Sequence, residues 1–90
     1  ERRKVAAEIE AAAVELEQAR EIEELAVERF RLAVDTQALF AKAFTLGELD
    51  LPARLRAENE RFDAERALTR ARIEAGRAIS RLNQARGLLP

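Results

Sequence analysis

The clearest candidates for acid–base or nucleophilic chemistry in this ninety-residue sequence are its carboxylates and its single serine, Ser80. The sequence contains no histidine, so Ser80 has no imidazole to activate it as a nucleophile. Glu23 and Glu24 are adjacent carboxylates, but they fall on a polar helix face without the apolar pocket that raises a carboxyl pKa. Cysteine is also absent, which removes the usual ligands of soft metals. We therefore expect no enzyme, no metal site and no cofactor.

Arginine is the other residue type with a possible function, because nine arginines lie between residues 51 and 86. Acidic residues alternate with them at helical spacing, and the net charge of the whole chain is −1. The expected pairs are Arg54–Glu58, Arg56–Glu60, Arg61–Glu65, Asp63–Arg66, Arg70–Glu74 and Glu74–Arg77. Such pairs are typical of a solvated helix face, and no aromatic platform or glycine-rich loop accompanies them. We expect no nucleic-acid partner.

The segment that must organise these side chains is a helix stop followed at once by a helix start. Gly47 can adopt a positive φ just past a helix end, and Asp50 can accept hydrogen bonds from the free N–H groups of the next helix. Pro52 is tolerated in that helix's first turn. The sequence predicts an all-α fold: one domain, residues 1–90, forming a long antiparallel two-helix coiled-coil hairpin. Its parts are a helix over residues 3–45, a tip over 46–50 and a helix over 51–86.

The first predicted helix carries two apolar series at alternating spacings of three and four residues. The first series is Val5, Ile9, Ala12, Leu16, Ala19, Glu23, Ala26, Phe30, Ala33, Gln37, Phe40 and Phe44. The second is Ala11, Val14, Gln18, Ile22, Leu25, Arg29, Leu32, Thr36, Leu39, Ala43 and Leu46, about a third of the circumference away. One series is enough for a hairpin, so two series predict a further neighbour. Glu23 and Gln37 are either partly wet positions that set the register or residues facing an aqueous lumen.

The second predicted helix has a seam of small residues: Ala53, Ala57, Glu60, Ala64, Ala67, Ala71, Ala75, Ala78, Leu82 and Ala85. Larger residues flank that seam, namely Leu55, Phe62, Leu68, Ile73 and Ile79. Gly76 interrupts this pattern. It either marks a close crossing of the two backbones or has no structural significance. Gly87 is the expected C-cap, with Pro90 soon after.

Two helices alone bury little apolar surface, so we expect further copies or partner segments to complete the packing. The isolated chain could pair into a four-helix bundle through its exposed seam. The sequence begins at Glu1 without an initiator methionine, which suggests a piece of a longer protein. No stretch is apolar for the roughly 20 residues that a membrane helix needs.

The stretch from Phe44 through Gly47 and Asp50 to Glu58 resembles the tip of the TolC-like outer-membrane efflux proteins, which combine a large apolar residue, a glycine, a short turn and a leucine-rich restart. Residues 80–90 are similar to the end of the returning helix in that family. The amino-acid sequences of both stretches are most similar to the heavy-metal cation efflux branch of that family.

This resemblance implies a trimeric channel with a membrane β-barrel and a periplasmic α-barrel, of which the chain would be one hairpin. It implies export of metal cations or small toxic compounds, docking to a periplasmic adaptor protein and, through it, to an inner-membrane pump. The docking residues would be Leu46, Gly47, Glu48, Leu49, Asp50 and Leu51. Family members often carry carboxylates one and two turns past the tip, where this chain has Ala53 and Arg56. Asp50, Arg56 and Glu58 are therefore the gate candidates here.

Two alternatives remain from the sequence. The hairpin of the adaptor protein itself resembles an Arg-x-x-Leu-x6-Ser pattern straddling its tip, and Arg70, Ile73 and Ser80 have that spacing far from Gly47. A generic helical oligomerisation module would instead tolerate any turn sequence at the tip.

Overall fold

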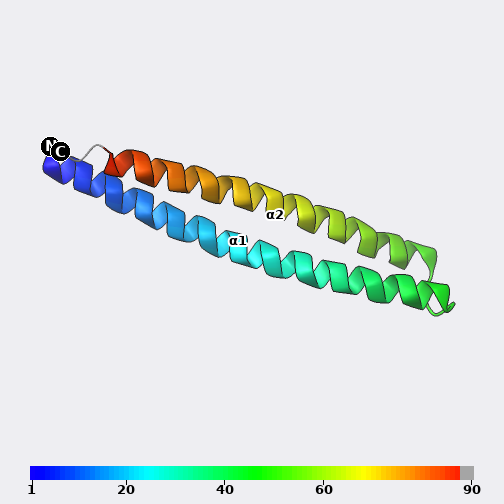
Figure 1. Ribbon diagram of the computed structural model, residues 1–90. Coiled ribbons are helices and arrows are strands. Elements are labelled where there is room, and N and C mark those ends of the chain that lie inside the picture. Colours follow the sequence, from blue (N-terminus) through cyan, green and yellow to red (C-terminus); the bar gives the residue numbers. More distant parts are fainter. Residues whose placement is uncertain (88–90) are drawn as a thin grey trace. The chain divides into compact units, whose positions relative to one another are not determined.

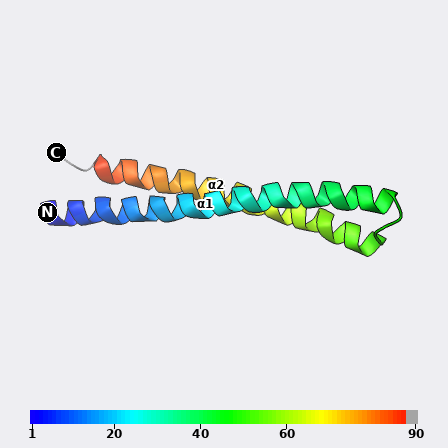
Figure 2. The same cartoon turned by 90° about the horizontal axis from the view of Figure 1, so that it is seen from below.

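The computed structural model describes residues 1–87 and contains two helices joined by one turn. Helix α1 runs over Arg2–Thr45 and helix α2 over Leu51–Arg86, with residues 46–50 between them (Figures 1 and 2). The predicted all-α helical hairpin is thereby confirmed. The chain divides into two compact units, and both helices contribute to each. Unit 1 comprises Glu1–Glu24 and Arg70–Pro90, and unit 2 comprises Leu25–Thr69.

Unit 2 has a thin core made almost entirely of alanine. Its buried residues are Ala26, Ala33, Ala57, Ala64 and Leu68. The α1 members belong to the first predicted series, and the remaining members of that series in this unit, from Phe30 to Phe44, are half-buried. Alanine at the contact lets the two backbones approach closely, and the phenylalanines close the sides of the seam.

Unit 1 repeats this arrangement with the other ends of the helices. Its buried residues are Ala12, Ala71, Ala75, Ala78 and Leu82, and Ala78 is fully inaccessible. The start of α1 lies beside the end of α2 in this unit (Figure 1). An ion pair links them across the outside of the seam, because Arg81 donates through Nε to the Glu15 carboxylate at 3.2 Å.

The small-residue seam of α2 is confirmed with two corrections. Glu60 was expected within the seam, but it is exposed and pairs with Arg29 instead. Leu68 was expected as a flanking residue, but only 5% of it is exposed. Both differences have one cause: a carboxylate without a buried partner is costly to bury, whereas a leucine gains by burial.

Gly76 within α2 and Gly87 just after it have different roles. A Cβ on Gly76 would meet nothing within 4 Å, so this residue marks no close backbone crossing. Helix α2 ends at Arg86, one residue before Gly87, as the C-cap expectation required. Gly87 does not have a positive φ, however, and its N–H simply continues the helical pattern by donating to the Asn83 carbonyl at 3.0 Å. Pro90 lies outside the described residues.

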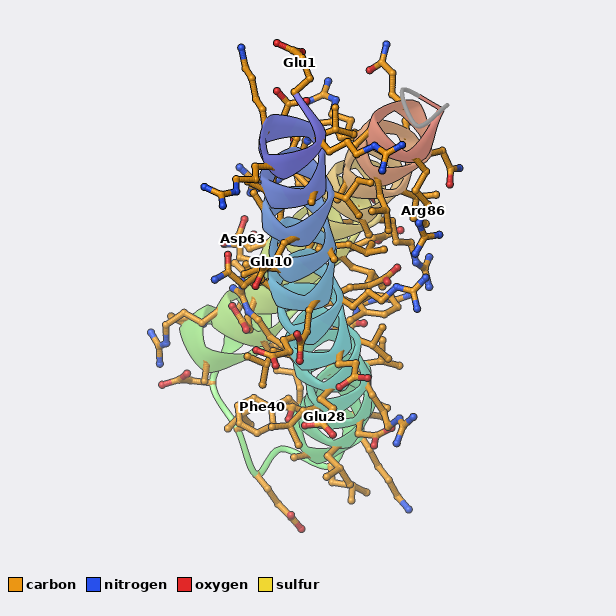
Figure 3. The ribbon with its side chains drawn as sticks, turned by 90° about the vertical axis from the view of Figure 1, so that its left-hand side faces the viewer. Glu1, Glu10, Glu28, Phe40, Asp63 and Arg86 are labelled. Atoms are coloured by element: carbon orange, nitrogen blue, oxygen red, sulfur yellow. The ribbon has the colours of Figure 1, made fainter. Side chains whose placement is uncertain are left out.

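The second series of α1 lies on the surface in both units. Its large members are exposed: Val14, Ile22, Leu25, Leu32, Leu39 and Leu46. Nothing else in the described part of the chain covers them. Figure 3 shows long charged side chains projecting outward along the same helices, with Glu10, Glu28 and Asp63 among those labelled.

Candidate functional site: the hairpin tip

The tip comprises residues 46–50 together with Leu51 at the start of α2, and a Schellman motif at the end of α1 fixes its backbone. Gly47 has a φ of +74°, the left-handed conformation that residues with a Cβ adopt only at a cost. The Gly47 N–H donates to the Phe44 carbonyl at 3.0 Å, and the Glu48 N–H donates to the Ala43 carbonyl at 2.9 Å. These two bonds satisfy carbonyls that the helix end would otherwise leave without partners. The prediction that Gly47 adopts a positive φ just past the helix end is confirmed.

The start of α2 is capped by Asp50, also as predicted. The Ala53 N–H donates to Asp50 Oδ1 at 2.9 Å, and the Arg54 N–H donates to the Asp50 carbonyl at 3.2 Å. The negative carboxylate lies at the positive end of the helix dipole. Because Asp50 serves as the cap, its carboxylate is held in place by the backbone of its own chain.

Arg54 connects the two helices just above the turn. Its guanidinium lies 4.9 Å from the centroid of the Phe44 ring, which is a cation–π distance. Its Nε also donates to Glu58 Oε1 at 3.3 Å. The pair with Glu58 was predicted from spacing, but the stacking on Phe44 was not. Phe44 and Arg54 lie at similar distances from the turn, which is the sequence signal that could have indicated their contact.

The surface of the tip is apolar with acidic residues beside it. Leu46 is 62% exposed and Leu51 is 50% exposed, whereas Leu49 is half-buried. Glu48 and Asp50 are exposed on the same short segment. Exposed leucines are common in proteins. Here Glu48 and Asp50 lie between Leu46 and Leu51, so apolar and acidic groups share one short exposed segment held by its caps.

The three gate candidates have separate contacts in the structure. Asp50 caps α2 and Glu58 accepts from Arg54, so both carboxylates are engaged within the tip region. Arg56 is exposed and takes part in none of the ion pairs within residues 1–87. No group of three or more potential metal ligands occurs in this described part of the chain.

The adaptor-like pattern of Arg70, Ile73 and Ser80 lies inside α2 and within unit 1. The tip belongs to unit 2, so this pattern does not straddle the turn. Over residues 1–87, neither helix combines the length and the apolar character that a bilayer crossing demands.

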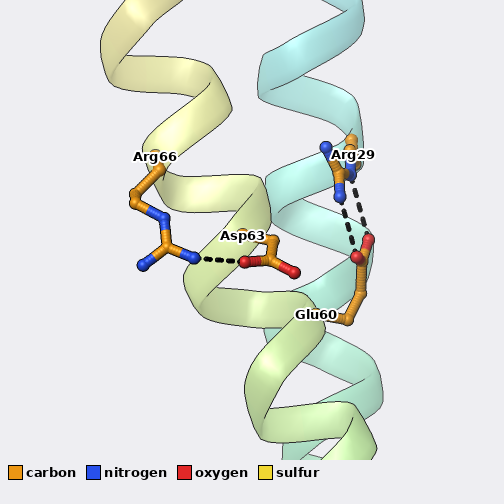
Figure 4. A network of polar contacts seen from close by, with 4 residues as sticks. All are labelled: Arg29, Glu60, Asp63 and Arg66. Atoms are coloured by element: carbon orange, nitrogen blue, oxygen red, sulfur yellow. Dashed lines mark hydrogen bonds and ion pairs between the residues drawn. The ribbon is translucent and has the colours of Figure 1, made fainter.

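A second polar feature of unit 2 is a bidentate ion pair between Arg29 of α1 and Glu60 of α2 (Figure 4). Arg29 donates through Nε at 3.0 Å and through Nη2 at 2.8 Å to the two oxygens of Glu60. These hydrogen bonds lower the pKa of Glu60 and raise the pKa of Arg29. Beside the pair lies a shallow groove walled by Leu32, Thr36 and Ala57.

Other polar side chains of the two helices also form hydrogen bonds and ion pairs. Gln37, the polar member of the first series, accepts a hydrogen bond from Arg61 at 2.7 Å, which agrees with the expectation that it sets the register. Arg61 therefore does not use its predicted partner Glu65. Arg66 pairs with Asp63, and Arg77 pairs with Glu74 at 2.7 Å, as predicted. Glu23, the other polar member, is half-buried beside a shallow groove of unit 1.

Comparison of the chain with family models, with curated proteins and with solved structures found no match in any of the three.

Proposed function

We propose that this hairpin is part of the periplasmic α-barrel of a TolC-like outer-membrane efflux channel, and that its tip docks a periplasmic adaptor protein. One observation carries the proposal: the tip is a rigid, capped turn that exposes Leu46 and Leu51 beside Glu48 and Asp50. A turn that only reverses the chain has no need of exposed leucines, since small polar residues serve equally well there. The resemblance of Phe44 to Glu58 to the tips of that family supports the same function.

Under this proposal the adaptor, coupled to an inner-membrane pump, completes a path for metal cations or small toxic compounds. Leu46, Leu49 and Leu51 supply the apolar contact, and Glu48 and Asp50 attract basic residues of the adaptor. Arg56 and Glu58, just above the turn, are then gate residues. Because Ala53 and Arg56 replace the acidic ring of other family members, cation selectivity at that ring does not come from those two positions.

The experiment measures binding of the ninety-residue chain to a purified adaptor protein of a heavy-metal efflux system. Leu51→Asp and Gly47→Val should each weaken binding at least tenfold, the first by placing a charge in the contact and the second by distorting the turn. Phe62→Asp is the matched control, because Phe62 is exposed to a similar extent, 58% against 50% for Leu51, but lies outside the tip.

Circular dichroism of each variant checks that both helices persist. The proposal predicts that binding weakens as salt is added, since the tip is acidic. Absence of binding by the unmodified chain, or equal binding by Leu51→Asp and Phe62→Asp, would rule the docking function out.

A further inference from the structure

Each helix end at the tip is capped within its own helix. The Gly47 and Glu48 N–H groups donate to carbonyls in the last turn of α1. Asp50 accepts from N–H groups in the first turn of α2. These hydrogen bonds end α1 and begin α2, but none of them joins one helix to the other. The spacing between the two helix ends therefore depends on other contacts.

The buried core of unit 2 ends before the tip. Ala33 on α1 and Ala57 on α2 are the buried residues nearest to the turn. Every residue from 34 to 56 is either half-buried or exposed. The close alanine contact that holds the helices together further along the hairpin is thus missing where the tip is presented.

One side chain, Arg54, bridges the two helix ends. Its guanidinium lies 4.9 Å from the centroid of the Phe44 ring on α1, and its Nε donates to Glu58 on α2 at 3.3 Å. The Arg54 and Glu58 side chains are 34% and 29% exposed, which makes theirs the least exposed ion pair within residues 1–87. The hydrogen bond from Arg61 to Gln37, which also joins the helices, lies seven residues further from the turn on each helix.

We propose that Arg54 is a positioning residue of the tip: it holds the end of α1 against the start of α2, so that Leu46 and Leu51 are presented in one arrangement. Leu46 follows Phe44 by two residues and Leu51 precedes Arg54 by three, so the placement of both leucines depends on this contact. A partner that binds them meets a surface that is already ordered, which lowers the entropic cost of binding. The effect on affinity rests on the proposed docking function.

The chemistry of arginine suits this position better than that of lysine. The planar guanidinium can lie over an aromatic ring while its Nε donates to a carboxylate, whereas the lysine ammonium is a compact point charge. The methylene stem of arginine also covers apolar surface beside the ring. We therefore expect Arg54→Lys to keep the charge but to lose most of the positioning.

Amide hydrogen exchange of the ninety-residue chain, followed by NMR, tests the positioning without any partner. Arg54→Met keeps the length of the side chain but removes the guanidinium, so the Gly47 and Glu48 amides should exchange about fivefold faster or more. Arg61→Met is the matched control, because it removes the contact with Gln37 and should leave those amides unchanged. Unchanged exchange in Arg54→Met, or equal acceleration by both variants, would overturn the inference.

Binding to the purified adaptor protein tests the consequence for docking. Arg54→Met and Phe44→Leu should each weaken binding about threefold, and the double variant should bind about as well as either single variant, because both remove the same contact. Phe44→Tyr keeps the ring and should bind like the unmodified chain. Losses that multiply in the double variant would contradict a shared action of Phe44 and Arg54. If the unmodified chain does not bind, the docking function fails, while the exchange experiment still decides the role of Arg54.

Discussion

Gly47 and Gly76 are the same residue type under opposite backbone constraints. Gly47 has a φ of +74° and ends α1, whereas Gly76 is inside α2 with a helical backbone. A side chain at Gly47 would strain the turn although space is available, and a side chain at Gly76 would meet nothing within 4 Å. The value of glycine at each position therefore depends on φ and not on crowding.

We expect Gly47→Ala to lower the free energy of unfolding by about 1–2 kcal/mol, because alanine is disfavoured in the left-handed region. Gly76→Ala should raise it by up to about 1 kcal/mol, because alanine is the better helix former. Urea denaturation at one fixed protein concentration measures both changes. Opposite signs for the two variants are the expected result, and a stabilising Gly47→Ala would contradict the role of Gly47.

The Arg29–Glu60 pair gives a pH dependence whose sign follows from its geometry. The hydrogen bonds from Arg29 hold the pKa of Glu60 below its ordinary value, so the unfolded chain binds a proton more readily at this carboxyl than the folded chain does. The stabilisation is complete above the ordinary glutamate pKa and is lost as the pH falls through the lowered one.

Glu60→Gln should therefore flatten the dependence of the melting temperature on pH as the pH falls below the ordinary glutamate pKa. Glu65→Gln, at another exposed glutamate of α2, should leave the profile close to that of the unmodified chain. Equal flattening by both variants would show that the ion pair with Arg29 is not the cause. Salt should weaken the effect, since both side chains are about half exposed.

At the scale of the helices, close packing depends on alanine at the contact. Ala64 of α2 is completely inaccessible and belongs to the core of unit 2. A larger side chain there must push the helices apart or adopt a strained rotamer. The same volume added on an exposed side of a helix costs nothing of this kind.

We expect Ala64→Leu to lower the free energy of unfolding of the chain by about 1–3 kcal/mol, the usual cost of overfilling a packed contact. Ala38→Leu, at an exposed alanine of α1, should change it by less than about 0.5 kcal/mol. Thermal unfolding followed by circular dichroism distinguishes the two. If both substitutions were equally tolerated, the close contact at Ala64 would not govern the packing of unit 2.

At the scale of the whole molecule, the chain has a small core and much exposed apolar surface. Ten residues, eight of them alanine, are the buried apolar residues of the described chain, while eleven large apolar residues are exposed. Such a chain gains stability from further helices packed against it. The exposed leucines of the tip and of the second apolar series both follow from this shortage of core.

The sequence by itself determined the helices and the turn between them. Helix propensity, the apolar periods, Gly47 and Asp50 act within a few residues of the chain, so their effect can be read without knowing the fold. The same local rules identified the first apolar series of α1 and the alanine seam of α2, because small residues on one helix face favour close contact.

Only the tertiary structure decided which residues face which. It left the leucine series exposed while the alanine and phenylalanine series faced α2. It also left Glu60 outside the contact, buried Leu68, and brought Arg29 to Glu60 and Arg54 to Phe44. The physical reason is that the rotation of a helix about its axis is set by competition among side chains of both helices. Periodicity in one strip of sequence gives the candidate faces, but the choice between them depends on which partner side chains lie opposite.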